Sequence, residues 1–277
     1  MILSIRHLST YTYAESVFPE PHYLNFYPQQ REHLDLKDFQ IRIDPSPEGL
    51  SVRINSENNL QHQCWFNRSI DEMKIAVEMK VESSAFNPFS FFIEADEELS
   101  VLTQQHPSLI PYLNHNEVID DDLKHWIARH STIKGDYISW ITSLNHDICN
   151  EWKHTIRYEA NLFSPEECFR AKTGSCRDLS WLLIIALREL GLPARFVSGY
   201  AFNPELGEGH ELHAWIEVWL PGAGWLGVDP SAGIYTNEAY IPISTSYHPG
   251  LTLPVIGKYR GNATSKLETE VIISRID

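Results

Sequence analysis

One cysteine lies where a thiol could react, and a histidine and an aspartate follow it along the chain. Cys176 stands in "KTGSCRDLSWLLIIALRELGLPAR", between a Gly-Ser pair and two charged residues, directly before a long apolar run. Downstream, "ELHAWIEVWLPGAGWLGVDPS" contains His213 and Asp229. A thiol that attacks a carbonyl carbon needs a base, and that base needs a group that orients it. These three residue types therefore predict nucleophilic catalysis by a cysteine.

The residues around the thiol have the pattern of a helix start. Ser175 followed three residues later by Asp178 is a capping-box pattern, which makes Ser175 the N-cap and Cys176 the first helical residue. A helix N-terminus stabilises a thiolate, and its free backbone N–H groups can bind the oxygen of a tetrahedral intermediate. We expect Ser175 and Asp178 to support this site, Asp178 chiefly as a capping charge. A Trp or Gln of residues 140–165 is a further candidate for binding that oxygen.

The register of two predicted strands decides whether the histidine and the aspartate can meet. His213 opens one strand, and Asp229 closes the next after a Pro-Gly-Ala-Gly turn. With a four-residue loop, Ile216 would face Asp229, and His213 would lie on the opposite face of the sheet. With a three-residue loop, Trp215 faces Asp229, and His213 becomes its diagonal neighbour on the same face. A catalytic pair requires the second register or a bulge, and Trp215 would then lie close enough to wall the site.

The elements that must position these residues follow a β-rich first part. Alternating apolar and polar residues in "LSIRHLSTYTYAES", "FQIRIDPSPEGLSVRINSENN" and "MKIAVEMKVESSAF" predict short strands and a sandwich-like domain over residues 1–95. In the last of these, one face carries Ile75, Val77, Met79 and Val81. The period changes after this part, and we place the domain boundary near residues 86–98.

The second part, residues 96–277, predicts helices followed by strands. "HPSLIPYLN", "DDDLKHWIARH" and "SWITSLNHDICNEWKHTIRY" have helical patterns, and residues 178–190 form the strongest predicted helix. "ARFVSGYAF", "LHAWIEVWL", "GWLGVDP" and the closing "KLETEVIISRI" predict strands. A helix followed by antiparallel strands is typical of an α+β domain.

Three blocks of the sequence resemble a known family. "GSCRDLSWLLIIALRELGLPARFVSGYAF" and "HAWIEVWLPGAGWLGVDPSAG" resemble the transglutaminase-like superfamily of papain-type cysteine enzymes, and "HLSTYTYAESVFPEPHYLNFYP" resembles the N-terminal domain of its bacterial branch. The resemblance implies Cys176 as nucleophile, His213 as general base and Asp229 as the group that orients the imidazole. It also implies a papain-like core, with the nucleophile helix packed on an antiparallel sheet, preceded by a β-sandwich-like domain.

The reaction implied by this resemblance acts on amide bonds of a peptide or protein through an acyl-thioester. The family contains cysteine proteases and amidases, in which water accepts the acyl group, and transglutaminases, in which an amine does. We favour hydrolysis, because water is abundant and the sequence marks no second site for an amine. A protein-glutamine transglutaminase and a non-catalytic binding module on the same fold are the alternatives.

Charge and composition argue against several other classes of protein. The chain has 22 Lys+Arg against 37 Asp+Glu, a net charge of −15, which disfavours binding to nucleic acid. The longest apolar run, "WLLIIAL", is too short to span a bilayer, so no membrane association is expected. The start lacks the pattern of a signal peptide, and the four cysteines have no regular spacing. These features favour a cytoplasmic protein without a disulfide framework.

Two groups of possible metal ligands stand close together in the sequence: His210, Glu211 and His213, and His146, Cys149 and His154. The first lacks the His-Glu-x-x-His order on a helix, and the second fits no standard zinc spacing. No loop has the pattern of a calcium site. The sequence therefore predicts no metal and no cofactor.

Overall fold

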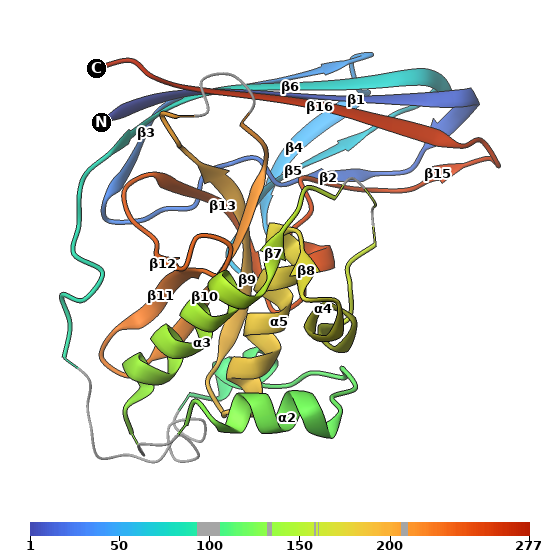
Figure 1. Cartoon of the computed structure of the whole chain (residues 1–277). Helices are drawn as coiled ribbons and strands as arrows, with labels where there is room; N and C mark the ends of the chain where they lie inside the picture. Colours follow the sequence, from blue (N-terminus) through green and yellow to red (C-terminus); the bar gives the residue numbers. More distant parts are fainter. Residues whose placement is uncertain (93–105, 132–134, 158, 160, 206–209) are drawn as a thin grey trace.

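The molecule combines a β-rich N-terminal part with a core of helices packed on an antiparallel sheet (Figure 1). Its structure is a computed structural model of the whole chain, in which residues 1–92, 106–131, 135–157, 159, 161–205 and 210–277 are described. The architecture is α+β, as the sequence predicts. Among the described residues, no helix has the length and the apolar character needed to cross a bilayer.

Two antiparallel sheets build the N-terminal part. The larger has the order β15-β1-β6-β3, with β16 also paired to β1, and the smaller has the order β14-β2-β5-β4. Their strands are β1 (Ile2–Pro19), β2 (His22–Leu24), β3 (Leu34–Asp44), β4 (Gly49–Ile54), β5 (Leu60–Trp65), β6 (Ile70–Ser83), β14 (Val255–Ile256), β15 (Tyr259–Arg260) and β16 (Ser265–Arg275). The predicted inward face of β6 is confirmed, because Ile75, Val77, Met79 and Val81 are all buried.

A third antiparallel sheet, of order β12-β11-β10-β9-β13, forms the centre of the molecule. Its strands are β9 (Ala194–Ala201), β10 (His213–Leu220), β11 (Gly224–Asp229), β12 (Ile234–Tyr235) and β13 (Tyr240–Ser246). The helices are η1 (Pro107–Tyr112), α2 (Asp121–Ala128), α3 (Tyr137–Glu151), α4 (Pro165–Ala171), α5 (Cys176–Glu189) and η2 (Pro249–Leu251). α5 packs against β9 and β10, and α3 and α4 pack against α5. Helix α5, which begins at Cys176, therefore lies on the sheet that carries His213 and Asp229.

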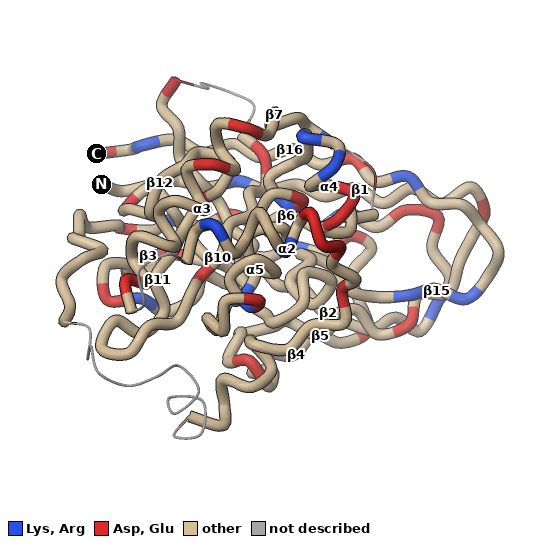
Figure 2. Tube along the Cα trace, turned by 60° about the horizontal axis from the view of Figure 1, so that its bottom comes forward, with Lys and Arg blue, Asp and Glu red and all other residues tan. Residues whose placement is uncertain are grey.

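The charged residues are arranged around these elements rather than gathered in a basic stripe. In Figure 2, red segments lie near the labels of α2 and α4. The first turn of α2 carries Asp121 and Asp122, and that of α4 carries Glu166 and Glu167. Acidic side chains at a helix N-terminus interact favourably with the helix dipole. These acids therefore stabilise the helices that surround α5.

The predicted helix over residues 139–158 is shorter in the structure. α3 ends at Glu151, and β7 (Lys153–His154) then pairs in parallel with β8 (Thr173–Gly174). The buried Trp152 is the turning point, since its indole N–H donates to the carbonyl of Cys168 at 2.9 Å. This tertiary contact ends the helix where the apolar periodicity alone would continue it, and it brings His154 beside the segment that leads into α5.

The last strand also departs from its expected place. "KLETEVIISRI" is a strand, as predicted, but β16 pairs with β1 along 11 residue pairs rather than with the core. Val271 and Ile273 are buried within the N-terminal apolar cluster. The two termini consequently lie side by side (Figure 1). The boundary expected near residues 86–98 extends into residues outside the described ones, and the division into domains stays a prediction.

The central sheet contributes residues to two apolar clusters. Ala214, Ile216 and Val218 of β10 belong to the same apolar cluster as the helices. Residues of β9 and β13 belong instead to the cluster of the N-terminal sheets: Tyr200, Ile241 and Ile243. Arg31 adds a charged link across this second contact, because it pairs with the buried Glu217 of β10 at 2.7 Å. The N-terminal part therefore contacts the sheet through residues of β9 and β13, and through Arg31 at Glu217 of β10.

Candidate active site

Helix α5 begins at the predicted residue. Ser175 is its N-cap and Cys176 its first residue, and the thiol side chain is half-buried. The backbone N–H of Ser175 donates to Oδ2 of Asp178 at 2.8 Å, and the Ser175 hydroxyl donates to the same oxygen at 2.6 Å. Ser175 is thus engaged by the helix start, which orients the backbone on which Cys176 sits.

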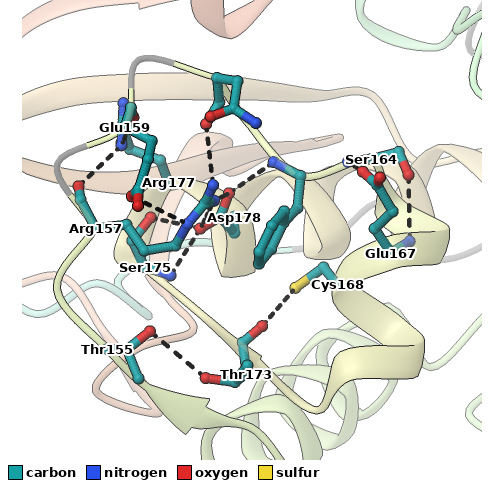
Figure 3. A network of polar contacts seen from close by, with 12 residues as sticks. Thr155, Arg157, Glu159, Ser164, Glu167, Cys168, Thr173, Ser175, Arg177 and Asp178 are labelled. Carbon is teal, nitrogen blue, oxygen red and sulfur yellow. Dashed lines mark hydrogen bonds and ion pairs between the residues drawn. The ribbon is translucent and has the colours of Figure 1, made fainter.

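Asp178 joins three separate segments at this helix start (Figure 3). Besides the bonds from Ser175, its carboxylate accepts two from Nη1 of Arg157, at 2.7 and 2.8 Å, and one from the backbone N–H of Phe163 at 2.9 Å. Burial alone would raise the pKa of Asp178, but the hydrogen bonds from Ser175, Arg157 and Phe163 lower it. The carboxylate therefore holds the nucleophile helix in place, in agreement with the capping charge that we expected.

The register of β10 and β11 brings the histidine and the aspartate together. Leu220 faces Gly224 and Ile216 faces Val228, so the connecting loop has three residues, which confirms the second of the two registers. His213 and Asp229 then share one face, and Nε2 of His213 lies 2.7 Å from Oδ2 of Asp229. With Nε2 bound to the carboxylate, Nδ1 is the ring nitrogen left for a reacting group.

Asp229 is buried in a set of hydrogen bonds that keeps it ionised. Its Oδ1 accepts from the backbone N–H and the hydroxyl of Ser231, at 2.9 and 2.6 Å, and its Oδ2 accepts from the Tyr240 hydroxyl at 2.7 Å. Burial opposes the charge, but the His213 charge and these bonds lower the pKa of Asp229 to about 2. Burial also opposes protonation of His213, and Asp229 nonetheless raises its pKa to about 10. The pair thus favours an imidazolium beside a carboxylate.

The thiol of Cys176 interacts with two imidazoles and one backbone amide. Burial would raise its pKa, but hydrogen bonds to His154, His213 and the Ala214 N–H, together with the His213 charge, lower the pKa to about 6. A thiolate is therefore available at neutral pH. The contact with His154 had no counterpart in the sequence reasoning, because a lone exposed histidine on a predicted helix carries no sign of such a role.

Trp215 lies beside the imidazole rather than over the thiol. Its ring centroid is 6.1 Å from that of His213, with an interplanar angle of 29°, and it meets Tyr240 edge-on at 5.2 Å. The side chain is 1% exposed, and it is absent from the described residues that line the cavity around Cys176. Trp215 therefore packs beside His213 without forming a wall of this cavity, and it is not placed to donate to an oxygen bound there.

Two cavities meet at His213. One, of about 570 Å³, is lined by Cys176, His154 and Asp229 among others. The other, of about 420 Å³, has mainly apolar walls that include Phe163, Trp181 and Leu253. The side chains of Arg177, Leu212 and His213 line both. Ligand pockets with apolar walls and a few convergent polar groups are typical of enzyme sites, so an extended substrate has room on each side of the imidazole.

The possible metal ligands are not brought together. His210 contacts the backbone of Asn203 through Nε2, whereas His213 binds Asp229. Among the described residues, no three His, Cys, Asp or Glu side chains are placed to hold a metal ion. The other thiols are free: Cys64 and Cys168 are fully buried, and Cys149 is half-buried.

Comparisons with known proteins agree with this architecture. The family model of the Transglutaminase-like superfamily matches residues 130–230, and that of the Bacterial transglutaminase-like N-terminal region matches residues 3–82. The chain therefore belongs to the transglutaminase-like superfamily and carries its bacterial N-terminal region. The crystal structure of a candidate cysteine protease from Cytophaga hutchinsonii superposes with a TM-score of 0.75 over 100% of this chain and 92% of that one, at 18% identity. This similarity supports the fold.

The curated relatives match over shorter stretches. An uncharacterized protein of Mycobacterium leprae, ML0607, is 34% identical over 109 residues, which is 37% of this chain and 38% of that protein. YebA of Bacillus subtilis, also uncharacterized, is 31% identical over 93 residues, 30% of this chain and 12% of the relative. A protein-glutamine gamma-glutamyltransferase of Pseudomonas aeruginosa is 39% identical over 70 residues, 23% of this chain and 10% of that enzyme. The chain thus spans well under two thirds of each.

Proposed function

We propose that this protein is a cysteine hydrolase that cleaves amide bonds of peptides or proteins through an acyl-thioester. The observation that carries the proposal is the chain of contacts from Asp229 through His213 to Cys176, at the N-terminus of α5. A lowered thiol pKa beside a raised imidazole pKa is the pattern of an activated nucleophile.

In the first half of the reaction, the Cys176 thiolate attacks the carbonyl carbon of the substrate. A C–S bond forms, and the carbonyl π electrons move to oxygen, which the Cys176 N–H is placed to bind. The His213 imidazolium then gives its proton to the amide nitrogen as the C–N bond breaks. The amine leaves, and the acyl group remains on sulfur.

In the second half, His213 takes a proton from water as the water oxygen attacks the thioester. The tetrahedral intermediate collapses with departure of the thiolate, and the acid product and the free enzyme are released. Asp229 keeps the imidazole oriented and stabilises its charge through both halves.

An amine acceptor is the second candidate, since one relative is a protein-glutamine gamma-glutamyltransferase and a second cavity adjoins His213. All steps up to the thioester are shared by the two reactions. The acceptor can be identified by offering a casein substrate with and without a fluorescent alkylamine. New peptide termini indicate hydrolysis, whereas fluorescence retained on full-length casein indicates transamidation.

The rate of iodoacetamide labelling against pH tests the proposed nucleophile. Cys176 should label fast from pH 6, and His213→Ala should move its profile toward the ordinary thiol range near pH 8.5. Cys149 is a control within the same chain, because burial raises its thiol pKa. Labelling of Cys176 that is no faster than that of Cys149 at pH 6 would favour a non-catalytic binding module instead.

A further inference from the structure

A two-residue ladder places a second histidine at the thiol. His154 of β7 pairs with Gly174 of β8, two residues before Cys176. The Lys153 N–H donates to the Lys172 carbonyl, and the Thr155 N–H donates to the Gly174 carbonyl, both at 2.9 Å. Figure 3 shows the neighbouring contact between the hydroxyls of Thr155 and Thr173. The backbone of His154 is therefore fixed relative to the helix start that carries the nucleophile.

The side chain of His154 reaches the reacting atoms from this ladder. It lines the same cavity as Cys176 and His213, and its interaction with the Cys176 thiol lowers the pKa of that thiol. His213 is paired with Asp229, which suits the base, whereas no carboxylate among the described residues pairs with the ring of His154. The two imidazoles at the thiol therefore have different surroundings, and they suit different tasks.

We propose that the His154 side chain is the second donor of the oxyanion hole, together with the backbone N–H of Cys176. The proposal rests on the proposed function and names a residue of the same site. During attack, charge leaves sulfur for the carbonyl oxygen, so an N–H that binds the resting thiolate is released to bind that oxygen. His213 cannot do both, because its proton goes to the departing nitrogen.

Electron and proton movements balance in this step without a further reactant. The C–S bond forms, the π pair of the carbonyl moves onto oxygen, and the His154 N–H binds the oxyanion without giving up its proton. On collapse the C=O bond reforms, the leaving group departs, and the hydrogen bond from His154 is released. Loss of one oxyanion-hole donor typically lowers the rate on the order of 10²- to 10³-fold.

Two probes of the same thiol separate this role from activation of the thiolate. Iodoacetamide forms a C–S bond with loss of iodide and develops no oxyanion. p-Nitrophenyl acetate acylates the same sulfur through a tetrahedral oxyanion. Both second-order rates would be measured at pH 7 on the full chain, the first by peptide mass spectrometry at Cys176 and the second from release of nitrophenolate.

We expect His154→Ala to lower the acylation rate on the order of 10²-fold more than the alkylation rate of Cys176, because any change in the thiolate fraction affects both rates alike. His154→Gln keeps an N–H donor and should restore most of the acylation rate. His213→Ala is the matched control, since it should slow both reactions. Continued labelling of Cys176 by iodoacetamide also reports that the His154 variants keep the helix start intact.

Either of two results would overturn the assignment of His154. Unchanged acylation in His154→Ala would mean that the ring takes no part, and equal loss of both reactions would mean that it acts on the thiolate. Failure of the proposed function looks different, because wild-type Cys176 would then react with neither probe faster than Cys149 does.

Discussion

At the residue scale, the coupled titration of Cys176 and His213 sets the pH range of activity. The thiolate forms as pH rises through about 6, and the imidazolium loses its proton as pH rises through about 10. Turnover of a casein substrate should therefore follow a bell-shaped profile, with its acid limb near pH 6 and its basic limb near pH 10. Initial rates in a constant-ionic-strength buffer series check this. An acid limb at pH 8 or above would contradict a preformed thiolate.

Replacing Asp229 by asparagine should abolish most acyl transfer, although the asparagine side chain occupies the same space as the aspartate. Without the carboxylate, the imidazole is neither held in the productive tautomer nor stabilised as a cation, and losses on the order of 10³- to 10⁴-fold follow in related triads. Nitrophenolate release from p-nitrophenyl acetate measures the loss. Tyr240→Phe is the matched control, because it removes one hydrogen bond to Asp229 but keeps the charge. A D229N rate within tenfold of wild type would refute the triad.

At the element scale, the position of α5 depends on the carboxylate of Asp178. Its side chain is fully buried, and Arg157 is 12% exposed, so removal of the charge leaves a nearly buried guanidinium without its partner. Asp178→Asn should lower the free energy of unfolding by about 3–5 kcal/mol. Since the pKa of Asp178 is lowered by folding, its contribution is present above pH ~4 and is lost at more acid pH.

Urea denaturation of wild type and Asp178→Asn at pH 7 and pH 3 measures this contribution. Glu268→Gln is the control, because its ion pair with Lys266 is exposed and such pairs add little to stability. A stability difference between wild type and Asp178→Asn that stayed the same at both pH values would contradict an ionised carboxylate at the helix start.

At the scale of the whole molecule, the last strand closes a sheet that begins with the first. Ile273 of β16 is 3% exposed in the N-terminal cluster, whereas its neighbour Ile272 points to the other face and is half-buried. Ile273→Ala should lower the free energy of unfolding by about 2–5 kcal/mol, and Ile272→Ala by clearly less. Thermal melts of the two variants compare the same chemical change on opposite faces. Equal losses would contradict the pairing of β16 with β1.

The N-terminal part and the core contact each other at the central sheet. Tyr200 and Ile241 of this sheet belong to the N-terminal cluster, and Arg31 reaches Glu217 on β10. β10 also carries His213. The N-terminal part is therefore positioned to stabilise the strand that carries His213.

The amino-acid sequence by itself determined the nucleophile helix, its start at Cys176, the strands of His213 and Asp229, and the α+β class. These features depend on local patterns: capping residues, apolar periodicity and turn composition act within a few residues of one another. The sequence allowed a loop of three or four residues between β10 and β11. The structure has the three-residue loop, which places His213 and Asp229 on the same face of the sheet.

Only the tertiary structure decided three other features. α3 ends at Glu151 because Trp152 bonds to Cys168, and this contact delivers His154 to the thiol. β16 lies beside β1, although more than 250 residues separate their paired ends in sequence. The thiol pKa reflects groups from β7 and β10 that meet only after folding. Local propensity carries no information on contacts between distant segments, since those depend on how apolar faces from the whole chain are buried together.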